Sequence, residues 1–128
     1  EYAVLDREGR AHPFPRQIGL RDGADDTQVR VGVEDLGGRA GRKPLPVGLV
    51  ALTHYKEGVR LRLRSLSAGQ AFMGLMEHTF DLRRQPELAM QSLGAVLRGA
   101  KIIRGARGEA EETADALLRR LAAFTNSA

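Results

Sequence analysis

Hydrophobic and polar positions form their clearest pattern between residues 48 and 80. Residues 48–52 are a short apolar run of the length expected for a strand buried on both faces. After a turn at residues 55–58, three aliphatic side chains alternate with three arginines, which predicts a strand with one packed and one solvent-facing side. The aliphatic residues are Val59, Leu61 and Leu63, and the arginines are Arg60, Arg62 and Arg64.

A helix is expected directly after the second strand. Ser67 and Gln70 have the spacing of a capping box, in which each side chain accepts a hydrogen bond from the backbone N–H of the other residue. The apolar residues of this segment recur close to positions i, i+3, i+4 and i+7. They are Ala68, Ala71, Phe72, Leu75, Met76 and Phe80. We expect the two strands to pair and their aliphatic side to pack against Phe72, Leu75 and Met76.

The chain before residue 48 predicts short strands separated by rigid or exposed segments. Residues 2–5 form an apolar strand that ends in a polar turn, and residues 28–33 alternate as a further strand. The segment His12-Pro-Phe-Pro-Arg16 is not helical, because each proline biases the residue before it toward extended backbone. Residues 35–46 are rich in Gly and Pro and predict an exposed loop.

Two further helices with a strand between them are expected after residue 80. Pro86 suits the first turn of a helix that ends near Gly99. A short strand at residues 101–104 and a turn at residues 105–108 lead to the last helix, residues 109–124. The expected inward-facing residues are Leu88, Ala89, Leu93, Val96 and Leu97 in one helix, and Ala110, Ala114, Leu117, Leu118 and Leu121 in the other.

This order of elements predicts an α+β (mixed α/β) fold in a single domain of residues 1–128. Short strands come first, followed by three helices with one intervening strand packed on the sheet. The chain is 42% hydrophobic and 28% charged, which is ordinary for a soluble domain. No apolar run approaches the ~20 residues of a membrane-spanning helix, so no membrane association is expected. Cysteine is absent, which excludes disulfides and is compatible with a cytoplasmic location.

The net charge of +4 raises the question of nucleic acid as a partner. Seventeen of the twenty cationic residues are arginines, and aromatic residues make up 5% of the chain. No aromatic residues interleave with the basic ones, as a stacking platform for bases requires. We interpret the basic excess as solvated surface, so nucleic acid is not the expected partner. The row Arg60, Arg62 and Arg64 is interpreted as charged protection of an exposed sheet face or edge.

Common catalytic and metal-binding patterns are missing from the sequence. His12, His54 and His78 lie far apart without the spacing of metal ligands, and no serine lies in a Gly-x-Ser-x-Gly motif. Residues 37–44 lack the Gly-x-x-x-x-Gly-Lys-Ser/Thr spacing of a phosphate-binding loop, and Pro44 stands where the Mg²⁺-binding hydroxyl is needed. No metal site is predicted.

Arg16 is the remaining candidate for binding chemistry. The stiff Pro-Phe-Pro segment holds this arginine in a fixed direction, and a preorganised guanidinium suits bidentate recognition of phosphate. A structural turn with a solvated arginine explains the same residues. From the sequence pattern the two interpretations weigh equally.

Two segments resemble bacterial kinases related to HPr kinase/phosphorylase. His12-Pro-Phe-Pro-Arg-Gln-Ile-Gly-Leu-Arg21 is similar to a Pro-Phe-Pro-Arg-Pro-apolar-x-Leu-Lys segment of these kinases. Residues 77–87 are similar to a later Glu-Asn-Thr-Phe-Asn-like segment, and two helices separated by a short strand follow in both. Order and spacing agree over most of the chain. The departures are Gln17 for Pro, Arg21 for Lys, and His78 and Asp81 for Asn.

The resemblance implies an ATP-dependent serine kinase of the type found beside peptide-maturation genes. Its cofactors would be ATP and Mg²⁺, and its substrate a peptide or protein serine. The chain would be the C-terminal portion of a P-loop HPr-kinase-like fold, with Glu1 a remnant of an acidic Walker-B-like segment. In that fold Arg16 is the expected catalytic residue, and His12 and Arg21 are the expected phosphate- or substrate-binding residues.

The sequence contains no loop that could cradle the phosphates of ATP. The resemblance therefore also implies that an N-terminal P-loop segment is needed as a partner and that the chain is inactive without it. A homo-oligomer is compatible with this interpretation. The alternative is a non-catalytic basic module that binds an acidic protein partner or nucleic acid.

Overall fold

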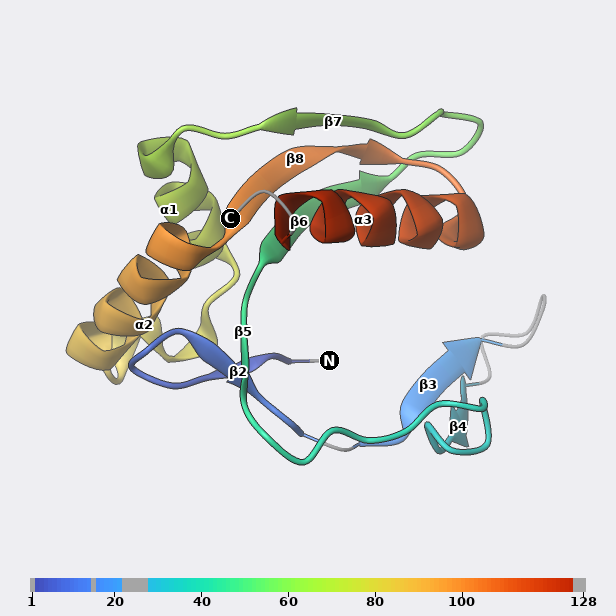
Figure 1. Ribbon diagram of the computed structural model, residues 1–128, viewed down its shortest axis with the longest axis horizontal. Helices are drawn as coiled ribbons and strands as arrows, with labels where there is room; N and C mark the ends of the chain where they lie inside the picture. The colour runs from blue at the N-terminus through green and yellow to red at the C-terminus, as the bar shows by residue number, and fades with distance from the viewer. Residues whose placement is uncertain (1, 15, 22–27, 126–128) are drawn as a thin grey trace.

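The structure, a computed structural model, describes residues 2–14, 16–21 and 28–125 (Figure 1). Short strands precede the helices, and the expected α+β class is confirmed. The strands are β1 (Val4–Leu5), β2 (Arg10–His12), β3 (Ile18–Arg21), β4 (Gln28–Val31), β5 (Leu45–Pro46), β6 (Leu49–Tyr55), β7 (Arg62–Ser65) and β8 (Lys101–Arg107). The helices are α1 (Ala68–Glu77), α2 (Pro86–Gly99) and α3 (Ala110–Thr125), with a short 3-10 helix η1 (Phe80–Arg83).

The principal sheet has the strand order β6-β8-β7, in which β8 runs parallel to β6 and antiparallel to β7. The predicted pairing of β6 with β7 is wrong, because β8 lies between them. β8 takes the centre with Ile102 and Ile103, which are only 5% and 1% exposed. It also continues through residues 105–107, where the sequence pattern predicts a turn. An added Cβ at Gly105 would meet the carbonyl oxygen of Arg62, so this glycine serves the close approach of β7.

Helix α1 begins where the sequence predicts. The Ser67 hydroxyl oxygen accepts a hydrogen bond from the Gln70 N–H at 3.4 Å, and the Gln70 side chain accepts one from the Ser67 N–H at 3.3 Å. The helix packs on the sheet through Gly74. An added Cβ there would lie 2.6 Å from Cδ1 of Leu52 and 3.1 Å from a guanidinium nitrogen of Arg104. Leu52 and Arg104 therefore project from the face of the sheet that α1 covers.

The arginine-rich strand β7 turns its charged side, not its aliphatic side, to the α1 face. Leu63 pairs with Gly105 and Arg64 with Arg104, and directly paired residues project to the same face of a sheet. Arg64 thus shares the α1 face with Arg104, and the predicted packing of Leu63 against α1 is wrong. The alternation itself is confirmed, since the aliphatic residues are half-buried and the arginines exposed. Alternation fixes which residues share a face, but not which face a helix covers.

Helix α3 lies along the opposite face (Figure 1). It starts beside Tyr55, whose hydroxyl donates to Oε1 of Glu109 at 3.2 Å. Its buried side is shifted from the predicted one, because Thr113 is 6% exposed. The Thr113 hydroxyl donates to the carbonyl of Glu109 at 2.7 Å, so burial leaves no polar group without a partner. Of the residues predicted to face inward, Leu117 and Leu121 are half-buried, whereas Ala110, Ala114 and Leu118 are exposed.

Helix α1 ends at Glu77, so the predicted apolar stripe is too long. Phe80 belongs to η1 and is 80% exposed, with its ring 5.0 Å from that of Tyr2 in an edge-to-face contact. Ala68, at the start of the stripe, is exposed as well. In α2 the prediction holds: Ala89, Leu93 and Val96 are buried, and Leu88 and Leu97 are half-buried.

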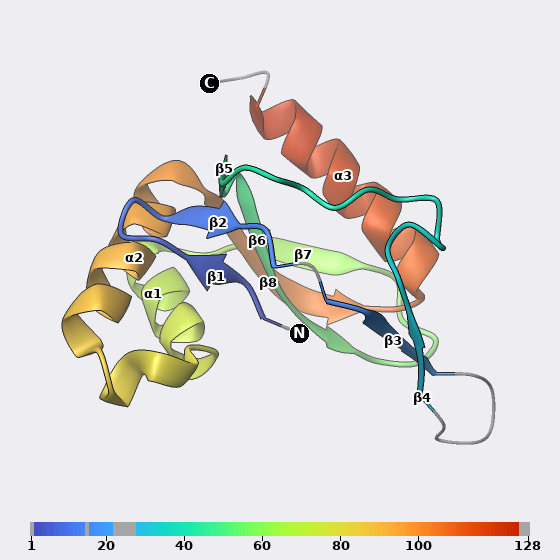
Figure 2. The same ribbon diagram turned by 90° about the horizontal axis from the view of Figure 1, so that it is seen from below.

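The β1–β2 hairpin rests on α2, and β5 pairs with the other edge of β2. Its turn contains Gly9 at φ +75°, where an added Cβ would lie 2.7 Å from the backbone nitrogen of Val96. Glycine is therefore required both by the left-handed backbone and by the contact with the helix. Among the described strands, β3 and β4 pair with each other and with no third strand, and they form an arm that projects from the rest of the molecule (Figures 1 and 2).

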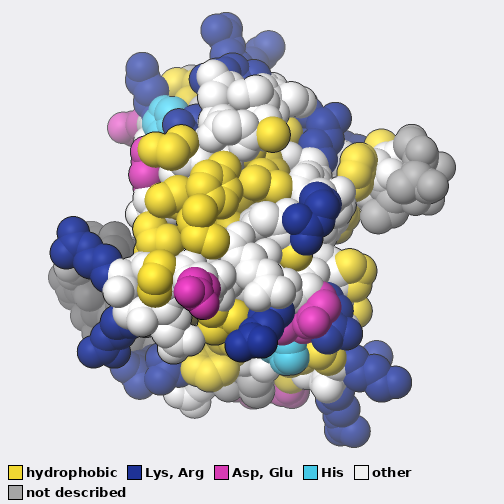
Figure 3. Space-filling model, turned by 90° about the vertical axis from the view of Figure 1, so that its left-hand side faces the viewer, with side chains coloured by type: hydrophobic (Ala, Val, Ile, Leu, Met, Phe, Trp, Pro, Cys, Tyr) yellow, Lys and Arg dark blue, Asp and Glu magenta, His cyan; other side chains and the backbone are white. Residues whose placement is uncertain are grey.

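The buried core is small for a chain of this length. The accessible surface is 10011 Å², whereas a folded monomer of 14.0 kDa exposes about 6,700 Å². Figure 3 shows hydrophobic side chains gathered in an exposed patch at the end of the molecule that carries α1 and α2. No helix in the described part of the chain is both long enough and apolar enough to cross a bilayer. In the described residues, the buried hydrophobic side chains are Ala71, Ala89, Leu93, Val96, Ile102 and Ile103.

Candidate functional site

An open cleft of about 880 Å³ lies between the Pro-Phe-Pro segment, the β3–β4 arm and the loop around residues 39–41. Pro13 and Phe14 follow the end of β2, Arg16 and Gln17 precede β3, and all four line the cleft. Strand β4 and the residues after it also line the cleft, through Gln28, Arg30 and residues 32–34. The rigid segment singled out in the sequence is therefore part of a concave surface.

Three arginines line this cleft, namely Arg16, Arg30 and Arg39. The guanidinium carbon of Arg16 lies 5.3 Å from the centre of the Phe14 ring, a cation–π contact that restricts the direction of the side chain. None of the three forms a hydrogen bond or ion pair with another described residue, and Glu34 is the one described acidic residue of the lining. Among the described lining residues, three arginines face one glutamate, so this part of the cleft carries a net positive charge.

Such a charge arrangement favours an anion. Guanidinium groups present planar, paired N–H donors that match the oxygens of phosphate or carboxylate, and they keep their charge at any physiological pH. Like charges that share a concave site repel one another, and a bound anion removes that repulsion. The chemistry available to the cleft is therefore the binding of a phosphate-bearing or carboxylate-bearing ligand and the stabilisation of negative charge on it.

Of the three site residues expected from the sequence, the structure describes the side chains of Arg16 and His12 and separates these two. Arg16 lines the cleft, whereas His12 lies in β2 outside the lining. Arg21 ends β3 and pairs with Gln28 through the backbone, and its side chain lies outside the described residues. The roles expected of Arg16, His12 and Arg21 all stay predictions.

Two further arginines of the cleft are missed by sequence reasoning. Arg30 lies on β4, where alternation predicts a strand but not its partner β3. Arg39 lies in the glycine-rich loop of residues 37–44, which reads as a flexible basic segment. In the sequence, each is a basic residue next to Gly or Val, a pattern that indicates a binding site only weakly. Only the folded chain brings the two arginines to the same cleft as Arg16.

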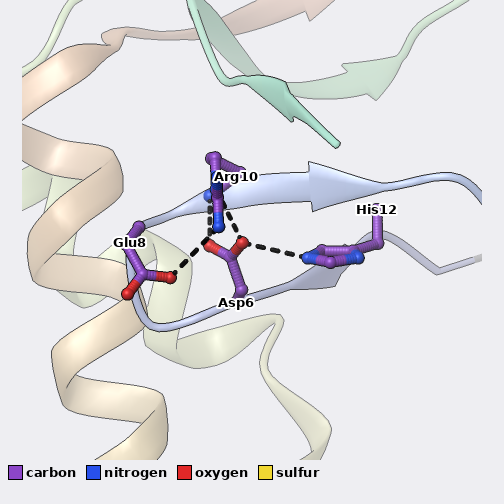
Figure 4. Close-up of polar contacts among 4 residues, drawn as sticks. All are labelled: Asp6, Glu8, Arg10 and His12. Carbon is purple, nitrogen blue, oxygen red and sulfur yellow. Dashed lines mark hydrogen bonds and ion pairs between the residues drawn. The ribbon is translucent and has the colours of Figure 1, made fainter. Parts of the chain in front are cut away.

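The start of the Pro-Phe-Pro segment is held by a polar cluster in the β1–β2 hairpin (Figure 4). The Asp6 carboxylate accepts hydrogen bonds from the backbone N–H and from Nε of Arg10, each at 2.8 Å, and Oδ2 lies 2.9 Å from Nε2 of His12. Glu8 adds a longer contact of 3.5 Å to the Arg10 guanidinium. The cluster fixes the end of β2 and therefore the point from which Pro13 leaves for the cleft.

The charge state of Asp6 follows from these contacts. Desolvation raises the pKa of the carboxyl, but hydrogen bonds from the Arg10 backbone, the His12 ring and the Arg10 guanidinium outweigh it and lower the pKa from 3.8 to about 2. Asp6 is therefore ionised over the whole physiological range and acts as an acceptor for the hairpin. It has no free proton to donate in acid–base chemistry.

A second, smaller groove of about 330 Å³ runs between α1 and strands β7 and β8. Arg104 and Arg64 line it from the sheet, and Arg104 is bonded to Glu77 of α1 at 3.4 Å. This groove is partly neutralised by Glu77, so the larger cleft is the stronger candidate for an anion. In the residues that the structure describes, no three His, Cys, Asp or Glu side chains cluster as metal ligands.

Comparison with models of known protein families, with curated proteins and with solved structures finds no match for this chain.

Proposed function

We propose that this chain is the phosphate-binding C-terminal portion of an HPr-kinase-like, ATP-dependent serine kinase that acts in the cytoplasm. The observation that carries the proposal is the position of Arg16. The residue lies on the Pro-Phe-Pro-Arg segment that resembles these kinases, and it lines a cleft together with two further arginines that have no acidic partner among the described residues. The substrate is a peptide or protein serine.

The arginines suit one part of phosphoryl transfer. The transferred phosphoryl group carries its charge on three oxygens, and fixed cations that meet these oxygens stabilise the transition state. Arg16, Arg30 and Arg39 fit this task, because they line one concave surface and none of them is paired with a described acidic residue. ATP would supply the phosphoryl group, and these side chains would hold its terminal phosphate oxygens.

The remaining parts of the reaction need a second segment. The sequence has no Gly-x-x-x-x-Gly-Lys-Ser/Thr loop, and the described residues offer no carboxylate cluster for Mg²⁺. A P-loop segment, in cis or in trans, would supply the phosphate cradle and the Mg²⁺ ligands. The surplus of about 3,300 Å² of accessible surface over a monomer of this mass supports such a partner.

A second candidate function is a non-catalytic module that binds an acidic protein segment. The exposed Arg62 and Arg64 favour it, because they add positive charge on a different face from the cleft. The two candidate functions predict different effects of adding a P-loop segment. If the chain is part of a kinase, the added segment enables phosphoryl transfer; if the chain is a binding module, the segment does not change its binding of an acidic peptide.

Reconstitution tests the proposal. The polypeptide encoded directly upstream of residue 1 is expected to contain a P-loop; it is produced separately and also joined in front of residue 1. Transfer of the γ-phosphate of ATP to serine is then measured for each part and for both together. We expect transfer only when both parts are present. An upstream coding sequence without a P-loop, or no transfer from the combined parts, would overturn the kinase function.

A further inference from the structure

Strand β6 has an unpaired edge. In the described chain β6 pairs with β8 alone. The Lys101 N–H donates to the Gly48 carbonyl at 3.0 Å, and the Lys56 N–H donates to the Arg107 carbonyl at 2.9 Å. Because alternate residues of a parallel strand bond the same neighbour, even-numbered residues of β6 face β8. The odd-numbered residues turn their N–H and C=O groups to the free edge, and these residues are Leu49, Ala51, Thr53 and Tyr55.

This edge lacks the usual protection against pairing. Natural edge strands carry Lys or Pro, contain a bulge, or are very short. β6 has seven residues without Lys or Pro, and its register with β8 runs through all seven without interruption. Residues 49–53 are half-buried and almost entirely apolar, the pattern of a strand inside a parallel sheet with both faces covered. β6 therefore has the composition of a central strand but lies at the edge of the sheet.

The carboxyl end of β6 lies at the same end of the molecule as the arginine cleft. β6 and β8 run parallel and end at Tyr55 and Arg107. Figures 1 and 2 both place the β3–β4 arm, which forms one side of the cleft, at the end of the molecule where these two strands finish. In a P-loop motif the phosphate-binding loop follows the carboxyl end of a strand. A parallel strand added beside β6 would therefore deliver such a loop on the side of the arginines.

We infer that the free edge of β6 binds, in parallel, the strand that precedes the phosphate loop of the P-loop segment. This inference rests on the proposed kinase function and names the contact through which the two parts join. The area agrees with it. Obligate interfaces bury roughly 2,000–5,000 Å² in total, about half on each side. The chain as a whole exposes about 3,300 Å² more than a monomer of its mass is expected to expose, so it leaves enough surface for such an interface.

Amide hydrogen exchange measured by NMR tests the inference residue by residue. In the chain alone, the outward amides of Leu49, Ala51, Thr53 and Tyr55 should exchange fast, and the inward amides at positions 50, 52 and 54 slowly. Adding the upstream P-loop polypeptide at about 100 times its Kd should slow the outward amides by about 100-fold. Outward amides that stay fast in the reconstituted complex would overturn the inference.

Two variants at one position sharpen the test. Thr53→Pro removes an outward N–H without removing a bond to β8, and should abolish protection of the other outward amides. Thr53→Val keeps the N–H and should retain protection. Slow inward amides in the Thr53→Pro variant verify that its sheet is intact; if the variant does not fold, the wild-type exchange pattern decides alone.

The outcomes separate this inference from the proposed function. Kinase activity with unprotected outward amides refutes the edge contact and leaves the function standing. Protection without kinase activity supports the edge contact and refutes the function. Protection in the chain alone that rises with its concentration assigns the edge to a second copy of this chain and overturns the inference.

Discussion

Nε2 of His12 lies 2.9 Å from Oδ2 of Asp6, across the two strands of the β1–β2 hairpin. The same carboxylate accepts two hydrogen bonds from Arg10, so one side chain joins the turn to the last residue before Pro13. His12, which the family resemblance places among the substrate-binding residues, makes its described polar contact inside the hairpin instead of in the cleft. Its structural contribution is to position the segment that carries Arg16.

The first prediction concerns the stability of the fold at acidic pH. The pKa of Asp6 is about 2 in the folded chain and 3.8 as the ordinary value, so the unfolded chain takes up the proton first as the pH falls. The stability that ionised Asp6 contributes is therefore present above about pH 4 and is lost as the pH falls toward 2. Asp6→Asn should be less stable than wild type at pH 6, and the difference should shrink between pH 4 and pH 2. Urea unfolding at several pH values measures this.

The matched control for Asp6 is Glu57→Gln. Glu57 is an exposed turn carboxylate without an ion pair to a described residue. The Glu57→Gln substitution should leave the loss of stability between pH 4 and pH 2 unchanged. If Asp6→Asn also leaves that loss unchanged, the hairpin cluster does not stabilise the fold.

The second prediction concerns Gly9. Gly9→Ala places a Cβ at φ +75° and within 2.7 Å of the Val96 backbone nitrogen, so either strain remains or the hairpin moves off α2. We expect a loss of at least about 2 kcal/mol in the free energy of unfolding. Gly58→Ala has a similar φ of +68° but no atom within 4 Å, and should cost only about 1–2 kcal/mol. Equal losses in urea unfolding would show that the hairpin does not depend on its contact with α2.

Local signals in the sequence predict the helices well and the sheet poorly. The Ser67–Gln70 capping box identifies the start of α1 because its partners lie three residues apart. Gly105 reads as a turn because its reason for being glycine, the approach of Arg62, comes from a distant part of the chain. Thr113 is not among the residues predicted to face inward, and its burial depends on a hydroxyl that is satisfied only once the helix has formed.

The residues of the candidate site show the same contrast between local and long-range information. Arg16 can be found from sequence because two neighbouring prolines make its segment stiff. Arg30 and Arg39 cannot, because their approach to Arg16 depends on the pairing of β3 with β4 and on the path of the following loop. Long-range pairing is set by the whole core, and short windows of sequence contain little of that information.

The third prediction concerns anion binding by the chain alone. Pyrophosphate should shift the NMR signals of residues that line the cleft, including Arg39 and Gly41. Arg39→Ala should weaken this binding by about tenfold or more, since a hydrogen bond to a charged group contributes about 1.5–3 kcal/mol. Arg119→Ala, which removes an exposed arginine of α3, should leave it unchanged. Shifts confined to the groove beside Arg64 would place the anion site there.

The fourth prediction concerns nucleic acid. The exposed arginine row Arg60, Arg62 and Arg64 has no interleaved aromatic residues, so DNA and RNA should bind weakly and without preference for sequence. Fluorescence anisotropy should give an affinity that falls steeply as salt is raised from 50 to 200 mM, on the scale expected for phosphate contacts alone. Sequence-selective binding at physiological salt would favour a nucleic-acid-binding module over the kinase.

We propose that Arg16 acts on the transferred phosphoryl group, and steady-state kinetics of the reconstituted kinase measure this role. Residues 1–128 alone should show no ATPase or kinase activity. In the complex with the P-loop segment, Arg16→Ala should lower kcat by about 10³-fold, the scale expected of an arginine that stabilises transition-state charge. The melting temperature should stay close to that of wild type, and Arg119→Ala should change neither quantity. A kcat for Arg16→Ala equal to wild type would make Arg16 a structural residue of the turn and contradict the account.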